Sequence, residues 1–148
     1  MKTSLFLRLL SIILTATAVS AHAVNRNITI AAPVEVSAGG SVTVAISAGT
    51  DAGDGEEVGF FHAEYSTDGG KTWAPIVFAR NSGSAVGKEI VFLAGAKGVK
   101  SLIRVRAAFR GGKAGDVDLL GKPIEWNGSW ENWRAPCTKY AVIYVNGR

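Results

Sequence analysis

The chain has 148 residues, a formal net charge of +4 and a single cysteine, Cys137. One cysteine excludes an intramolecular disulfide, and so small a positive charge is not the balance of a nucleic-acid-binding protein. The length suffices for one domain with its own core and is too short for a multi-bladed propeller.

The segment Met1 to Ala23 has the three parts of a secretory signal peptide. Lys2 and Arg8 precede an apolar run, and small residues stand at the cleavage-site positions up to Ala23. We expect cleavage near Ala23 and a secreted or periplasmic mature chain, 24–148. The alternative, a membrane anchor, is disfavoured because the run is shorter than the roughly 20 residues that cross a bilayer. No later run predicts a membrane span in the mature chain.

The mature chain contains short stretches in which apolar and polar residues alternate, separated by turn-forming residues. This period of two predicts β-strands, whereas no stretch keeps a helical period. The predicted strands are Asn27–Ala31, Ser41–Ser47, Val58–Ser66, Thr72–Phe78, Glu89–Leu93, Val99–Arg110 and Lys139–Asn146. About seven strands without a helix predict one all-β domain, an antiparallel sandwich of two sheets. Arginines alternate with apolar residues in Val99–Arg110, which predicts a central strand with one wet face.

Two stretches carry a resemblance to known families: the strand and turn from Tyr65 to Trp73, and the later run from Ile103 to Ala108. They resemble fibronectin III and related immunoglobulin-like domains of bacterial surface and exported proteins. The resemblance implies the sandwich fold and almost nothing about function. The cysteine pair of antibody domains is absent, which excludes that narrower family.

The turn from Ser66 to Trp73 also fits the Asp-box pattern S-x-D-x-G-x-T-W, which is known from sialidases and related propellers. In that family the motif is a hairpin brace, in which the aspartate accepts backbone N–H groups and glycines adopt positive φ. The motif occurs once here. We therefore interpret it as an architectural turn and not as a sign of glycosidase activity.

The connection Gly111 to Thr138, before the last predicted strand, is long for a compact sandwich, and loops of this length tend to be functional. Within it, three tryptophans form a candidate stacking platform for a sugar ring, with neighbouring polar residues as hydrogen-bonding groups. The alternative is that the indoles fold back and plug the open end of the sandwich. The candidate residues are Trp126, Asn127, Trp130, Glu131, Asn132 and Trp133.

A second candidate is the polar face of the predicted central strand. There Arg104 and Arg106 are expected to neighbour an aromatic and charged set on the adjoining strands and to bind an anionic or peptide partner. The alternative is an ordinary cross-strand ladder. The expected neighbours are Phe60, His62, Glu64, Tyr140 and Tyr144.

The sequence predicts no cofactor, no metal site and no enzyme. His62 is the one histidine left after cleavage, so a transition-metal site or a Ser-His-Asp triad is not supported. Calcium stays an open alternative at the acidic loop Asp51–Glu57 and at Asp116 and Asp118, although the spacing is not that of the twelve-residue calcium loop.

These observations predict an exported, non-enzymatic binding or adhesion module that contacts a glycan or a partner protein through the tryptophan-bearing connection. The alternatives are a structural subunit of a periplasmic or cell-envelope assembly and, third, a small hydrolase. The sequence leaves the oligomeric state and the pairing of Cys137 open.

Overall fold

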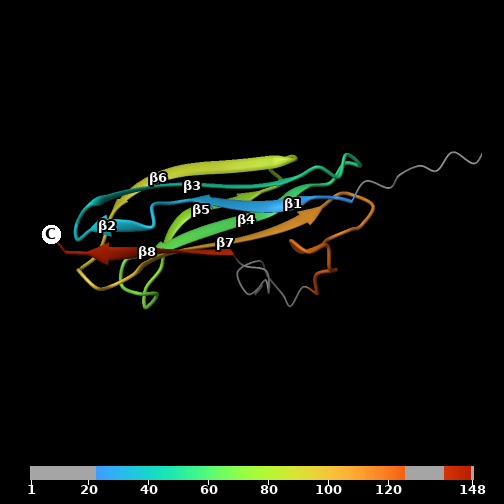
Figure 1. Ribbon diagram of the computed structural model, residues 1–148. Coiled ribbons are helices and arrows are strands. Elements are labelled where there is room, and N and C mark those ends of the chain that lie inside the picture. Colours follow the sequence, from blue (N-terminus) through green and yellow to red (C-terminus); the bar gives the residue numbers. More distant parts are fainter. Residues whose placement is uncertain (1–22, 126–138, 148) are drawn as a thin grey trace, which may run out of the picture.

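The computed structural model describes residues 23–125 and 139–147, and Figure 1 shows strands in two layers. Within these ranges there are eight strands and no helix. The strands are β1 (Arg26–Ala31), β2 (Glu35–Ser37), β3 (Ser41–Thr50), β4 (Glu57–Ser66), β5 (Ala74–Arg80), β6 (Ala85–Leu93), β7 (Ser101–Arg110) and β8 (Lys139–Asn146). A small sheet has the order β1-β3-β6 and a large sheet the order β2-β8-β7-β4-β5. The prediction of an all-β chain in two sheets is confirmed.

Every predicted strand has an observed counterpart, but three of them begin two or more residues away from the predicted position. β5 begins at Ala74, because the turn before it extends through Trp73, and β7 begins at Ser101. β6 begins at Ala85, within a segment that the sequence marks as a loop, because it pairs with β3 as far as Gly49. Cross-strand pairing overrides the low strand propensity of its small residues.

The strand that the sequence did not predict is β2, a piece of three residues. Glu35, Val36 and Ser37 pair in parallel with the end of β8. Because β1 belongs to the small sheet, the chain changes sheets between β1 and β2. So short a strand has no readable period and depends on the partner that it meets.

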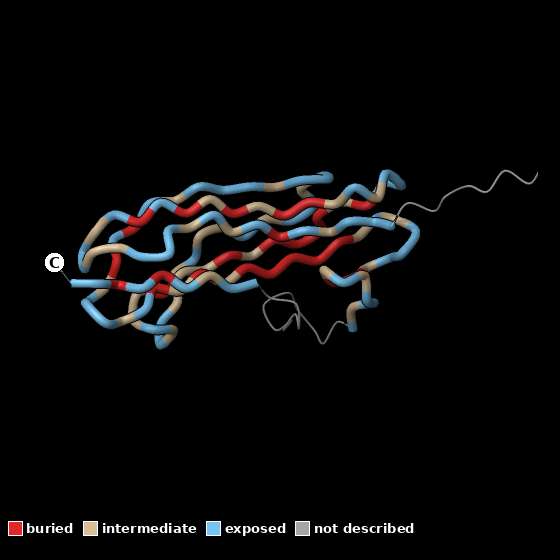
Figure 2. Tube along the Cα trace, in the orientation of Figure 1, coloured by how far each residue is buried: buried red, intermediate tan, exposed pale blue. Residues whose placement is uncertain are grey.

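The core lies between the two sheets, where the buried segments of Figure 2 face one another. Alternate residues of β3 point inward and meet alternate residues of β4, β7 and β8. Burying one such large side chain stabilises the fold by about 1.5–3 kcal/mol. The central contributors are Val42, Val44, Ile46, Phe61, Ile103, Val105 and Ile143.

β7 lies between β8 and β4, so the prediction that it is central is confirmed. The prediction that one face of this strand is exposed to solvent holds only in part, because Arg106 and Ala108 are buried on that outer face. Ile124, from the connection after β7, packs there against Ala108 and Phe60. A returning loop has therefore covered one end of the outer face.

The described part of that connection, 111–125, docks on the end of β7. Phe109 and Val117 exchange backbone hydrogen bonds of 2.9 Å, and Val117 is buried. The carboxylate of Asp118 accepts the backbone N–H groups of Leu120 and Lys122. This half of the long connection thus has its own packing, as loops of such length tend to have.

Candidate functional site on the outer face of the large sheet

Strand register places the charged residues of β4 and β7 side by side on the outer face of the large sheet. His62 lies opposite Arg106, and Glu64 lies opposite Arg104. On the other side of β7, Arg104 lies opposite Tyr140 of β8. The predicted neighbourhood of these five residues is confirmed.

Two other predicted members of this face lie apart from the arginines. Tyr144 lies further along β8, where the Lys100 ammonium is 5.3 Å from the centre of its ring. Phe60 is opposite Ala108 and fully buried, with its ring edge-on to Phe78 at a centroid distance of 5.2 Å. Phe60 is thus part of the packing and not of the exposed surface.

Arg104 is held from two sides. Its Nε donates to Oε2 of Glu64 at 2.6 Å, and its guanidinium lies 3.9 Å from the ring centre of Trp73. Trp73 reaches this place because its Nε1 donates to the carbonyl oxygen of Gly70 in the preceding turn. A guanidinium stacked on an indole and paired with a carboxylate has little rotational freedom.

His62 is held in its neutral form. Nη2 of Arg106 is 2.6 Å from Nδ1 of His62, and an arginine can only donate, so Nδ1 accepts and carries no proton. Burial, the largest cause, lowers the pKa of His62, and Arg106 and Arg104 add to this against the opposing charge of Glu64. Burial acts to raise the pKa of Glu64, but the hydrogen bond from Arg104 and the nearby positive charges bring that pKa below its ordinary value.

The exposed part of the face is a stripe on β8, formed by Tyr140, Val142 and Tyr144. These side chains are 64%, 40% and 46% exposed. Arg104 of β7 and Lys100, the residue before β7, flank the stripe. Flat rings with phenol groups, next to fixed cations, suit a ligand that offers apolar surface together with hydroxyl or anionic groups.

The six candidate residues of the tryptophan platform lie outside the described residues. The chain on either side of them is described: Ile124 packs on the outer face, and Lys139 begins β8. Both of these flanking residues lie at the large sheet.

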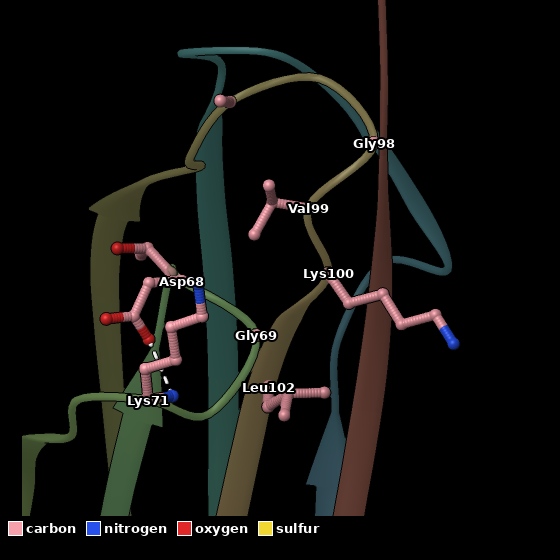
Figure 3. A pocket seen from close by; sticks show the side chains of 9 residues that line it. Asp68, Gly69, Lys71, Gly98, Val99, Lys100 and Leu102 are labelled. Atoms are coloured by element: carbon pink, nitrogen blue, oxygen red, sulfur yellow. Dashed lines mark hydrogen bonds between the residues drawn. The ribbon is translucent and has the colours of Figure 1, made fainter.

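A pocket of about 520 Å³ adjoins the face at the other end of β7. The turn after β4 and the loop before β7 form its walls, with Thr67 packed against Gly95, where a Cβ would come within 2.1 Å of the Thr67 carbonyl oxygen. Figure 3 shows the Val99 side chain directed into the pocket and the Lys100 side chain directed away from it. Sequence reasoning missed this pocket, because two turns distant in sequence form it.

The turn that holds one wall of this pocket has the hydrogen bonds expected of a brace. Oδ1 of Asp68 accepts the backbone N–H groups of Lys71 and Thr72, each at 2.9 Å, and Oδ2 accepts the Thr72 hydroxyl at 2.6 Å. The hydrogen bonds from Thr72, followed by those from Ser66 and Lys71, strongly lower the pKa of Asp68. Gly69 and Gly70 adopt positive φ.

The acidic residues considered for calcium have protein partners. Glu56 is buried and accepts hydrogen bonds from Arg26 and from the Thr50 hydroxyl. Asp54 accepts backbone N–H groups of Glu56 and Lys113, and the latter is the main cause that lowers the pKa of Asp54. Within 23–125 and 139–147, no three acidic, histidine or cysteine side chains gather as metal ligands would. In the same ranges, no helix is long and apolar enough to cross a membrane.

Comparison with known proteins finds little similarity. No family model matches the chain, and no curated protein matches it. Among solved structures, the sporulation control protein Spo0M from Bacillus subtilis aligns with 86% of this chain, at 11% sequence identity and a TM-score of 0.38. The alignment spans about half of that protein, 51% of its chain. Similarity at this level supports no inference about function.

Proposed function

We propose that the protein is an exported recognition module with an immunoglobulin-like or fibronectin III-like sandwich. In such sandwiches, strands A, B and E share one sheet, and strands C, F and G share the other. The chain order supports this assignment, because β1, β3 and β6 form the small sheet while β4, β7 and β8 lie together in the large one. The short β2 is then an edge segment that has crossed to the large sheet.

Export is proposed from the leader-like composition of Met1 to Ala23. The first strand, β1, begins at Arg26, shortly after the expected cleavage position. Cleavage after Ala23 therefore leaves the whole described sandwich intact. A mass spectrum of the protein recovered from the periplasm or the medium tests this, since the mature form should begin at Val24.

One observation carries the binding function: the exposed Tyr140–Val142–Tyr144 stripe lies beside immobilised Arg104. Large apolar rings at this exposure lose contact with water when a partner covers them, and the arginine is already oriented for hydrogen bonding. We propose a glycan or an envelope protein as the partner, bound without chemical change.

The test is binding of the mature protein to a carbohydrate panel and to immobilised envelope extract. Arg104→Ala and Tyr144→Ala should each weaken binding by about tenfold or more, because each removes a central contact. Thr43→Ala, on the outer face of the small sheet, is the matched control and should bind normally. Equal binding by all variants, or binding by none including the wild type, contradicts the proposal.

The tryptophans have a separate test. Single replacement of Trp126, Trp130 and Trp133 by alanine should reduce binding and leave the unfolding temperature unchanged if they form a platform. If the replacements lower the unfolding temperature without a specific loss of binding, the indoles pack over the open end of the sandwich and do not bind a ligand. In that case the recognition surface reduces to the stripe on β8.

A structural subunit of a periplasmic or envelope assembly is the second candidate. One observation favours it, because half of β8 presents a strand edge that β2 does not cover. Strand edges are the means by which such subunits join.

A further inference from the structure

The backbone groups of β8 alternate between its two neighbours. The Tyr144 N–H donates to the Val34 carbonyl oxygen, and the Asn146 carbonyl oxygen accepts from Ala38, so these two residues face β2. The Val145 carbonyl oxygen accepts from Gly98 on the opposite side. Since a strand alternates its in-plane groups, even-numbered residues of β8 face the β2 side.

The same alternation places the N–H and C=O groups of Tyr140 and Val142 on the β2 side. The β7–β8 register from 139 to 143 has no shift that would change this alternation. β2 begins at Glu35, which pairs with Tyr144, so within the described ranges no strand pairs with this earlier half of the β8 edge. Two donors and two acceptors are aligned along it.

β1 borders this open edge from the small sheet. The Asn25 carbonyl oxygen accepts from Asp51, so odd-numbered residues face β3 and even-numbered residues face outward. In agreement with this, the Ile28 carbonyl oxygen accepts a hydrogen bond of 2.7 Å from Nζ of Lys139. The Lys139 ammonium therefore lies between β1 and β8.

A groove of about 480 Å³ separates the two strands and is lined by Ile28, Thr29, Ile30, Lys139, Tyr140 and Ala141. The open stretch 139–142 is roughly 13 Å long at the strand rise of about 3.3 Å per residue. No carboxylate of the described residues forms an ion pair with Lys139. Among the described residues, the groove thus combines a strand edge without a partner strand, the side chains of Ile30 and Ala141, and one cation without an anionic partner.

We propose that this groove binds an extended segment of another polypeptide, which adds a strand to β8 in line with β2 and places a carboxylate near Lys139. Backbone hydrogen bonds to Tyr140 and Val142 hold the segment, as in other cases of strand addition. Its side chains alternate between the outer face beside Tyr140 and Val142 and the inner side of the groove. This inference deepens the second candidate function and does not depend on the recognition surface, since it uses the backbone edge and not the side chains of Arg104 or Tyr144.

Amide hydrogen exchange tests the premise. In the protein alone, the amides of Tyr140 and Val142 should exchange quickly and those of Ala141 and Ile143 slowly, because only the latter two face β7. Equal protection of all four amides overturns the inference.

The ligand probes are blocked peptides of about eight residues with alternating threonine and valine, carrying one glutamate or, in the matched set, one lysine. The best glutamate peptide should protect the amides of Tyr140 and Val142 and bind about tenfold more tightly than its lysine counterpart. N-methylation at alternate residues should abolish protection in one register and preserve it in the other. Lys139→Met should remove the preference for glutamate.

Each contrary result is decisive. If saturating peptide leaves both amides unprotected, or if both methylated registers behave alike, strand addition is wrong and Lys139 only guards the edge. Arg104→Ala and Tyr144→Ala leave the edge intact and should bind these peptides normally. Failure of the recognition surface and failure of the groove are therefore separate results.

Discussion

The outer faces of the two sheets differ although their inner faces are alike. Both inner faces carry alternating aliphatic and aromatic residues that form one core. The outer face of the small sheet carries small side chains on β3, Thr43, Ala45 and Ser47, with exposed Val91 and Leu93 beside them on β6. The outer face of the large sheet carries arginines, a histidine and tyrosines.

The outer face of the large sheet also differs between its two ends. At the β7 end nearest the long connection, Phe60 and Ala108 are covered by Ile124. At the opposite end, the rings on β8 stay exposed. The large sheet thus has a covered half and an open half, and four predictions separate them from each other and from the small sheet.

The largest effect is expected at the covered half. Phe60→Ala should lower the free energy of unfolding by about 3–5 kcal/mol, because a fully buried ring leaves a cavity. Thr43→Ala, on the outer face of the small sheet, should change it by less than about 0.5 kcal/mol. Urea unfolding measures both. If Phe60→Ala and Thr43→Ala change the free energy of unfolding by similar amounts, Phe60 does not contribute to the packing as described.

The next effect is expected at the turn after β4. Asp68→Ala should lower the unfolding temperature, since four hydrogen-bond donors lose their acceptor. Lys71→Ala keeps the same backbone donor and is the matched control. The pKa of Asp68 is lower when folded, so its contribution is complete above the unfolded value of 3.8 and is lost as the pH falls further. The Asp68→Ala variant should therefore lose less stability than the wild type as the pH falls below 3.8.

A smaller effect is expected from the pair in the open half. Arg104 and Glu64 are partly exposed, at 32% and 16% of their side chains, so solvent screens their attraction. A double-mutant cycle with alanine at both positions should give a coupling energy of about 0.5–1 kcal/mol. The coupling should decrease in high salt. A coupling energy near zero would show that the pair with Glu64 does not hold Arg104, which leaves stacking on Trp73 as its anchor.

The smallest effect is expected from His62. Its pKa is lower in the folded state than the unfolded value of 6.5, so folding favours the neutral ring. The contribution of His62 to the free energy of unfolding should be fully present above pH 6.5. It should decrease as the pH falls from 6.5 toward the folded pKa, because the unfolded chain takes up a proton first. His62→Gln should flatten this region of the stability profile. Thermal unfolding between mildly acidic and neutral pH measures it.

Alternation in the sequence was sufficient to predict seven of the eight described strands and much of the site. The period of two in Val58–Ser66 and in the strand that follows Val99 predicted which side chains share a face, and the register confirmed that His62 and Arg106 meet. Such inferences succeed because side-chain direction in a strand depends on local geometry alone.

Other features had no local signal. β2 exists because the end of β8 offers it a partner, and the first residues of β6 are extended because β3 continues beside them. The stacking of Trp73 on Arg104 depends on how the Asp68 turn folds back over the sheet. None of these contacts follows from the residues nearest to them in sequence.

The sequence by itself determined the strand periods, the braced turn and the identity of the charged face. Only the tertiary structure decided that Phe60 is covered and that the turn at Asp68 and the loop at Val99 enclose a pocket. It also decided that no strand of the described residues pairs with half of the β8 edge beside Lys139. The physical reason is the same in each case. Burial and edge pairing depend on which segments distant in sequence arrive at one place, and local propensity carries no information about that.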